Sequence, residues 1–204
     1  MITIINFKMG NLGSISNMLK HIGAKSTITS DPAAIESAEK IILPGVGHFD
    51  KAMYNLKQLE LVDVLRKKVL KDCVPVMGIC LGMQLLCTSS EEGGMDGLGF
   101  IDASVKRFSF SKDNGLKIPH MGWNLVKVEK LSPLMAGTRQ DSRFYFVHSY
   151  HAVCNDPKDV LSSTQYGYRF TSSVERNNII GVQFHPEKSH SFGMQLLKNF
   201  IEKY

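Results

Sequence analysis

The chain has 204 residues, of which 43% are hydrophobic and 21% charged, and this composition is typical of a globular protein rather than a disordered one. The formal net charge is +5, but no basic stripe with interleaved aromatic residues is present, so nucleic-acid binding is not expected. The four cysteines contain no C-x-x-C pair, which argues against structural zinc and against a secreted disulfide framework. No segment resembles a signal peptide or a membrane span, so we expect a cytoplasmic protein without metal or cofactor.

The first half of the chain alternates strand-like and helix-like segments. Ile2–Ile5 and Ile41–Leu43 are short apolar runs that predict buried strands, and a glycine-rich loop follows the second. Between them, an amphipathic stretch predicts a helix that Gly23 is suited to end, and Asp31-Pro32 predicts the start of another helix. Two further helical stretches follow. This alternation predicts a parallel sheet with helices on both faces.

The second half of the chain has a different character. Four segments separated by turn residues predict strands: Ile101–Phe108, Trp123–Val128, Phe144–Val153 and Ile179–Phe184. The apolar periodicity of residues 192–201 predicts a terminal helix. Because there is no internal repeat, linker or low-complexity segment, we expect residues 1–204 to form a single α/β domain. Its central sheet should be mostly parallel and flanked by helices, with a mixed or antiparallel extension.

The run PVMGICLGMQLL, residues 75–86, places a cysteine where an apolar strand-like segment turns into a helical one. Gly78 and Gly82 flank Cys80 two positions away on each side, in the G-x-C-x-G pattern of a nucleophile elbow. Small flanking residues permit the strained turn that exposes a reactive atom. A lone cysteine in an apolar run is more often a small buried side chain. The pattern therefore indicates catalysis only if the thiol has a partner.

The segment GVQFHPEKS supplies a candidate partner. The strand-like run Ile179–Phe184 leads directly to His185, and Glu187 would lie on the same side of an extended chain. A carboxylate beside an imidazole fixes its tautomer and stabilises its charged form, as the orienting acid of a triad does. Taken alone, His185 also fits a structural surface histidine. Because functional groups gather beyond the carboxyl ends of parallel strands, we expect Cys80 and His185 to meet there.

The combination of GICLGMQ, LPGVGHF and HPE resembles the class I, triad-type glutamine amidotransferases. More narrowly, IPHMGWN, FYFVHSYHA, FTSSVE and GVQFHPEKS resemble the glutaminase subunits of imidazole glycerol phosphate synthases, which serve histidine biosynthesis. The similarity covers essentially the whole chain. It implies the fold of that family and the hydrolysis of L-glutamine to glutamate and ammonia through a thioester on Cys80. His185 would be the acid and base of this reaction, and Glu187 would orient it.

The resemblance also implies roles for the residues around the thiol. Backbone N–H groups of Leu81 and of the loop at Gly45 and Val46 would form the oxyanion hole. The positions that match glutamine-binding residues of the family are Gly47, Gln84, Ser149 and Tyr150. For Ser149 and Tyr150, ordinary strand packing is an equally good interpretation.

A glutaminase of this size should deliver its ammonia to a partner. The resemblance implies a heterodimer with a separate (β/α)8-barrel cyclase, which makes imidazole glycerol phosphate and AICAR. Four residues match family positions at or near that interface: Asn11, Trp123, Tyr145 and Lys188. Singly, each also fits a structural role, as a loop cap, a core aromatic, a strand aromatic and a surface charge respectively.

The chain departs from the family pattern at its N-terminus. The usual N-terminal pattern of the family resembles D-Y-G-x-G-N-L. This chain has NFKMGNLGS at that place, with Asn6, Phe7 and Lys8 instead of the usual first three residues. HPEKSHSFG also differs slightly from the commonest ending. These changes lie on the face that is expected to bind the partner. An alternative is therefore that the chain supplies ammonia to a sugar-modifying amidotransferase of surface-polysaccharide synthesis.

Two other classes of protein are alternatives to the glutaminase. A stand-alone cysteine hydrolase would not need the glutamine-pocket residues together with the glycine-rich loop. An inert binding subunit is disfavoured because Cys80, His185 and Glu187 are all present.

Overall fold

The computed structural model describes residues 1–111 and 115–204. Within these ranges, the first strands are β1 (Ile2–Ile5), β2 (Ser26–Thr29), β3 (Lys40–Gly45), β4 (Val76–Cys80), β5 (Ser89–Ser90), β6 (Ala103–Arg107) and β7 (His120–Leu125). The later strands are β8 (Lys127–Val128), β9 (Arg143–His148), β10 (Tyr150–Cys154), β11 (Val160–Tyr166), β12 (Tyr168–Arg176) and β13 (Ile179–Val182).

The helices lie mainly in the first half of the chain. The α-helices are α1 (Leu12–His21), α2 (Pro32–Glu36), α3 (Phe49–Gln58), α4 (Leu61–Arg66), α5 (Leu81–Leu85) and α6 (His190–Lys203). A π-helical turn, Lys67–Lys71, continues α4, and short 3-10 turns cover Pro133–Met135, Pro157–Asp159 and Pro186–Lys188. In the described part of the chain, none of the helices combines the length and apolar character that crossing a membrane requires.

The start and stop signals in the sequence act as expected. The Asp31 side chain accepts a hydrogen bond from the Ala33 N–H at 3.0 Å, which caps α2 at the predicted position. The Asn11 side chain caps α1 in the same way, at 3.3 Å from the Ser14 nitrogen. Gly23 follows the end of α1 with a φ of +83°, a backbone conformation that glycine adopts without strain. Local capping chemistry therefore sets these helix ends.

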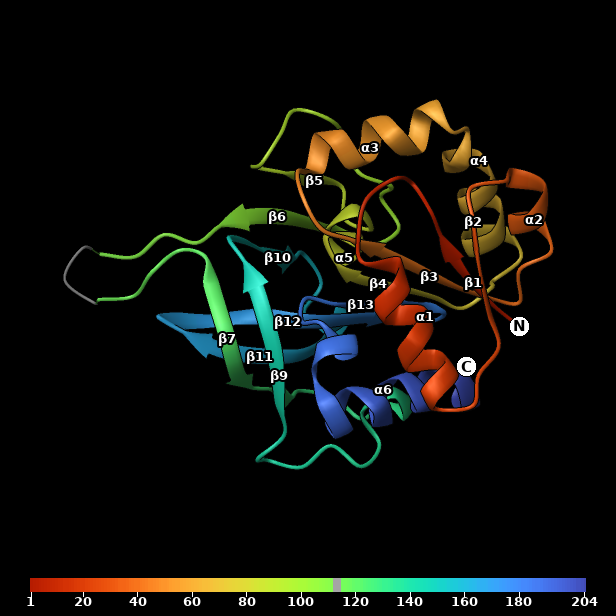
Figure 1. Cartoon of the computed structure of the whole chain (residues 1–204). Coiled ribbons are helices and arrows are strands. Elements are labelled where there is room, and N and C mark those ends of the chain that lie inside the picture. Colours follow the sequence, from red (N-terminus) through yellow and green to blue (C-terminus); the bar gives the residue numbers. More distant parts are fainter. Residues whose placement is uncertain (112–114) are drawn as a thin grey trace.

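The central sheet is parallel in its first half and mixed in its second (Figure 1). Its strand order is β2-β1-β3-β4-β13-β12-β10-β6-β5, with β11 beside β12 and β8 beside β11. The strands from β2 to β13 in this order all run parallel to their neighbours. Beyond β13, the pairs that β12 makes with β13, β10 and β11 are antiparallel. This arrangement confirms the predicted α/β class, with a parallel core and an antiparallel extension.

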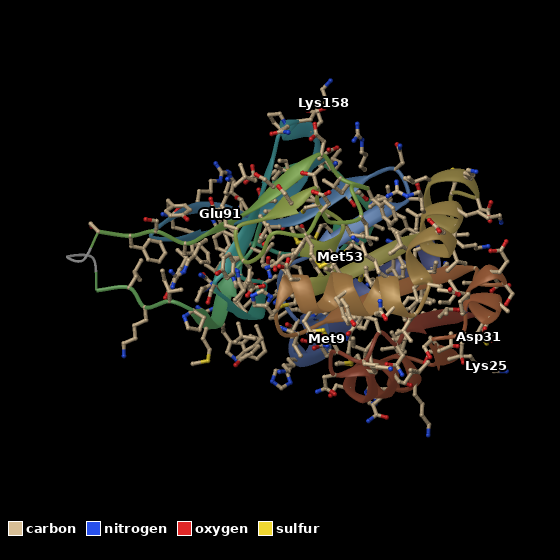
Figure 2. The ribbon with its side chains drawn as sticks, turned by 90° about the horizontal axis from the view of Figure 1, so that it is seen from above. Met9, Lys25, Asp31, Met53, Glu91 and Lys158 are labelled. Carbon is tan, nitrogen blue, oxygen red and sulfur yellow. The ribbon has the colours of Figure 1, made fainter. Side chains whose placement is uncertain are left out.

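Helices cover both faces of the parallel part (Figure 1). One face packs against α2, α3, α4 and α5, with Phe49 and Leu56 of α3 fully buried there. Figure 2 looks onto this side and labels Met53 of α3. The other face packs against α1 and α6, through buried residues such as Leu19 and Phe200. The inner strands β1, β4 and β13 are therefore buried on both faces, which explains their apolar character, whereas the edge strand β2 is only partly buried.

A second sheet of two strands, β7 and β9, accompanies the central sheet. The two strands are antiparallel, with His120 opposite His148 and Trp123 opposite Tyr145. The sequence did not indicate that these two strands form a sheet separate from the central one. The run Phe144–Val153, expected as a single strand, divides at Ser149 into β9 of the small sheet and β10 of the central sheet.

Other boundaries also differ from those expected. Trp123–Val128 divides into β7 and β8, which belong to different sheets. Gly45 was expected in a loop, but it is the last residue of β3 and pairs with Cys80. The strands β11 and β12 were not anticipated because hydroxyl residues replace the apolar ones inside them. The buried Ser162, for example, lies 2.9 Å (Oγ to Oγ) from Ser172.

Candidate active site

The cysteine elbow is built from strained backbone and two close-packed glycines. Cys80 ends β4 and precedes α5, with φ +54° and ψ −110°, a region that residues with a side chain rarely occupy. A Cβ on Gly82 would lie 1.7 Å from the carbonyl oxygen of Leu43, and one on Gly78 would lie 2.6 Å from the oxygen of Gly82. The turn therefore requires glycine at both positions. Strain of this kind is typical of functional sites.

The strand order brings the histidine to the cysteine. β4 and β13 are neighbours in parallel register, with Val182 opposite Ile79. Cys80 follows Ile79 directly, and His185 lies three residues beyond Val182, where its N–H donates to the Tyr145 carbonyl at 2.9 Å. Both residues therefore lie at the carboxyl edge of the parallel sheet, as the sequence predicts.

His185 and Glu187 form a buried pair. The His185 Nδ1 atom lies 2.8 Å from Glu187 Oε1, and the two side chains are only 3% and 2% exposed. A carboxylate accepts only, so Nδ1 carries a proton and donates it. The other ring nitrogen, Nε2, is buried and meets no hydrogen-bond partner of good geometry among the described residues. The pair thus has the form of a base and its orienting acid.

The environment of His185 favours its protonated form. Burial by itself lowers the pKa of the ring, but the nearby Cys80 and the hydrogen-bonded Glu187 outweigh it and raise the pKa to about 10. A protonated imidazole at this position can give a proton to a departing amine.

A pocket of about 310 Å³ opens over the thiol. Its lining combines residues of the elbow, the glycine-rich loop and the corner between β9 and β10: Val46, Gly47, Cys80, Leu81, Gln84, Glu92, Pro119, Val147, His148, Ser149 and Tyr150. The structure therefore brings together all the glutamine-binding positions that the sequence suggested. His185, Glu187 and Gly45 do not line the pocket; Gly45 lies in the strand pairing beside Cys80.

A larger cavity of about 720 Å³ lies beside β7, β8 and β11. None of the predicted catalytic or glutamine-binding residues lines it. At the described positions, no group of three or more His, Cys, Asp or Glu side chains could hold a metal ion. The chemistry that the residues can support is therefore concentrated at Cys80.

Two further polar residues near the thiol were not anticipated from the sequence. Gln183 is fully buried, and its Nε2 lies 3.7 Å from Cys80 Sγ while its Oε1 accepts from Gln84 Nε2 at 3.1 Å. Its position two residues before His185 in an extended run was the available signal. Glu92 lines the pocket and accepts from the Phe49 N–H at 2.9 Å. No motif marks Glu92, because its loop follows no regular pattern.

Three of the four candidate interface residues lie together. Trp123, on β7, stacks on His190 with ring centres 5.2 Å apart and meets the Tyr145 ring edge-on at 6.1 Å. The Lys188 ammonium lies 5.6 Å from the centre of the Tyr145 ring. Trp123 is 44% exposed, so its interpretation as a core aromatic is wrong. For Asn11, the structure confirms the loop-cap role.

The sequence model of the family "Glutamine amidotransferase class-I" matches residues 3–204. The chain belongs to the class-I glutamine amidotransferases. This result confirms the family that the elbow and the HPE segment indicated. Members of the family are glutaminases, and the chain is therefore an enzyme of this kind.

Relatives within the family are similar over their whole length. The imidazole glycerol phosphate synthase subunit HisH 2 of Methanococcus maripaludis is 55% identical over 203 residues, which are 100% of each chain. The protein of the same name from Pseudomonas aeruginosa is 52% identical over 202 residues, 99% of each chain. HisH 1 of Campylobacter jejuni strain RM1221 is 46% identical, over 98% of this chain and 99% of that protein.

Two solved structures share the fold of this chain. A crystal structure described as a glutamine amidotransferase superposes with a TM-score of 0.72 at 20% identity, over 98% of this chain and 97% of that one. The structure of PurLQS from Thermotoga maritima gives 0.73 at 17% identity, over 98% and 96% of the two chains. At such identities the likeness concerns the fold alone.

Proposed function

We propose that this chain is the glutaminase subunit of an imidazole glycerol phosphate synthase. It hydrolyses L-glutamine and passes the ammonia to a cyclase partner in histidine biosynthesis. The observation that carries the proposal is the strained Cys80 elbow, which stands beside the buried His185–Glu187 pair and under a pocket of about 310 Å³. Full-length identity of 55% to a relative named as such a subunit supports the pathway.

In the proposed reaction, the Cys80 thiol passes its proton to His185 as its sulfur attacks the side-chain amide carbon of glutamine. The C–N bond then breaks as His185 gives a proton to the leaving nitrogen, which yields ammonia and a glutamyl thioester. His185 next removes a proton from water, and the hydroxide formed attacks the thioester to release glutamate and the thiol. Glu187 holds the ring through Nδ1 in both steps.

The negative oxygen of each tetrahedral intermediate needs preorganised donors. We assign the Leu81 N–H, at the start of α5, and backbone N–H groups of the segment Gly45–Val46. Gly47 has a φ of +118°, and a peptide next to glycine can turn at low cost. Gly47, Gln84, Ser149 and Tyr150 line the pocket and are assigned to glutamine binding.

The partner is proposed to bind the face that includes Trp123, Tyr145 and Lys188, with Asn11 near its edge. Strand β7 turns apolar side chains outward here: Met121, Trp123 and Leu125 are 66%, 44% and 44% exposed. Exposed apolar side chains in a row are typical of a protein–protein interface. We assign this face to a (β/α)8-barrel cyclase in a heterodimer. We further propose that residues 1–204 form one domain and that the complex works in the cytoplasm.

The proposal is tested by purifying the native complex and assaying it. We expect a cyclase to copurify with the chain, and an ATP-using sugar amidotransferase in its place would contradict the pathway. Glutaminase rates are then compared for the chain alone, with partner, and with partner plus acceptor substrate. A loop that lacks one oxyanion donor at rest would hold the rate about 10²–10³-fold lower until the partner shifts it. Equal rates under the three conditions would leave no room for gating by the partner and would favour a stand-alone cysteine hydrolase.

A further inference from the structure

Three side chains that the proposed reaction does not use form a hydrogen-bonded chain beside the pocket, and one of them, His148, also lines it. His120 begins β7 and His148 ends β9, and the register of the small sheet places them opposite each other. The two histidines are 3% and 5% exposed. Asn124, four residues along β7 from His120, extends the chain. Two buried imidazoles in contact require an arrangement of protons that satisfies both.

The hydrogen bonds assign the proton on each ring. His148 Nδ1 lies 2.7 Å from the carbonyl oxygen of Tyr150, which accepts only, so Nδ1 is the donor. In the neutral ring Nε2 then accepts, and His120 Nδ1 donates to it at 2.9 Å. His120 Nε2 in turn accepts from Asn124 Nδ2 at 3.2 Å. Every donor meets an acceptor only while both rings are neutral.

Burial keeps these rings neutral. It lowers the pKa of His120 to about 4 and that of His148 to about 3. Both values lie well below neutral pH. The pair is therefore suited to fixed hydrogen bonding and unsuited to proton transfer during the reaction.

The carbonyl oxygen of Tyr150 joins this chain to the thiol. It also accepts from Gln84 Nε2, at 3.2 Å. Gln84 donates to Gln183, whose amide contacts Cys80 Sγ. Tyr150 and its neighbour Ser149 line the pocket at the corner where the chain leaves β9 for β10. The donor on His148, which itself lines the pocket, therefore holds the adjoining wall at Ser149 and Tyr150.

We propose that His148 is a positioning residue for glutamine binding. Its Nδ1–H fixes the Tyr150 carbonyl and with it the Ser149–Tyr150 wall, and His120 holds His148 in the donating tautomer. Loss of the donor loosens this wall but leaves the Cys80 elbow intact, because Gly78 and Gly82 form the elbow independently. The inference rests on the proposed glutaminase function.

The experiment measures labelling of Cys80 in the native complex of the chain with its partner by diazo-oxo-norleucine, a glutamine analogue that alkylates the catalytic thiol. Peptide mass spectrometry gives the half-saturation concentration and the maximal rate. Iodoacetamide labelling of Cys80, which needs no glutamine pocket, is measured in parallel. His148→Leu removes the donor, whereas His148→Asn keeps an N–H at the place of Nδ1. His151→Leu is the matched control, since His151 is equally buried but bonds to Tyr168.

In His148→Leu we expect the half-saturation concentration to rise about five- to tenfold, the effect of one lost hydrogen bond. The iodoacetamide rate should stay within twofold of wild type. His148→Asn should restore most of the affinity, and His151→Leu should not change it. His120→Leu tests the same chain without touching the Tyr150 carbonyl, and we expect a rise of about threefold.

Several outcomes would overturn the inference. One is an unchanged half-saturation concentration in both His148→Leu and His120→Leu. Another is a His148→Asn chain as weak as His148→Leu, or an equal loss of iodoacetamide labelling, because either would indicate a merely structural role. If wild-type Cys80 shows no saturable labelling by the analogue, the proposed glutaminase function fails, and this inference fails with it.

Discussion

Val182 of β13 pairs with Ile79 of β4, and this single register fixes where the thiol and the imidazole stand. Cys80 is the next residue after Ile79, and the chain beyond Val182 reaches His185 in three residues. Since both strands are buried on both faces, a shift of their register would disturb close packing on either side of the sheet. The sheet therefore acts as the rigid support for the two groups, and the elbow needs to orient the sulfur only locally.

The position of the elbow predicts that Cys80 is the sole nucleophile. Cys80→Ala should abolish glutamine hydrolysis, which a coupled glutamate assay of the complex measures. Alanine at the other three cysteines should leave the reaction largely intact. Burial raises the pKa of Cys87, and burial and nearby acids raise that of Cys154 to about 12, so neither forms a thiolate readily. Comparable losses in all four variants would refute the assignment.

A second prediction concerns the orienting acid. In Glu187→Gln the carboxylate that helps to raise the pKa of His185 is gone, so this pKa should fall below its wild-type value of about 10. NMR titration of the ring measures the change. The glutaminase rate should fall on the order of 10⁴-fold, less than after loss of Cys80 or His185. A variant with wild-type rate would mean that Glu187 does not orient the ring.

A third prediction concerns the glycine under the elbow. Gly82→Ala places a methyl group 1.7 Å from the Leu43 oxygen, so β3 or α5 must move. We expect a loss of at least about 3 kcal/mol in the free energy of unfolding, measured by chemical denaturation. Gly13→Ala is the control, because no atom lies within 4 Å of the added group. In helix α1 it should stabilise the chain by about 0.5–1 kcal/mol. Similar unfolding curves for the two variants would contradict the close packing.

The sequence allowed the placement of Cys80 in a strained turn and of Glu187 beside His185 to be predicted, because each of these features is local. The glycines around Cys80 and the two-residue spacing of His185 and Glu187 express geometry that a few adjacent residues determine. The corner at Ser149 could not be predicted in this way. Phe144–Val153 is continuously suited to a strand, and only the pairing of distant segments decides that it serves two sheets.

The roles of the polar residues around the pocket could not be predicted from the sequence, for a similar reason. Gln183 and His148 are polar side chains inside strand-like apolar runs, and their value depends on partners far away in the chain, such as Gln84 and His120. Hydrophobic periodicity carries no information about such pairs. The buried serines of β11 and β12 also went unnoticed, because hydroxyl groups that bond to each other can replace apolar packing.

The last prediction concerns acid. In the unfolded chain, histidines gain protons as the pH falls through about 6.5, whereas His120 and His148 stay neutral in the fold until about pH 4 and about pH 3. The unfolded state then binds more protons, so the free energy of unfolding should fall as the pH drops from about 6.5 to about 4. Each ring contributes up to about 1.4 kcal/mol per pH unit. His185 has the opposite sign: its raised pKa gives stability that is fully present below about pH 6.5 and is lost as the pH rises towards 10.

Urea unfolding of the wild type and of His148→Asn between about pH 7.5 and about pH 4.5 measures this effect. The range brackets the pKa of about 6.5 that a histidine has in the unfolded chain. Asparagine does not titrate, so the variant should lose stability less steeply in acid. The difference in unfolding free energy between the two chains should therefore shrink as the pH falls, because the wild type alone carries the penalty of a ring kept neutral. A difference that stays constant across the range would show that His148 is not held neutral by the fold, and the assignment of protons along the His120–His148 pair would then be wrong.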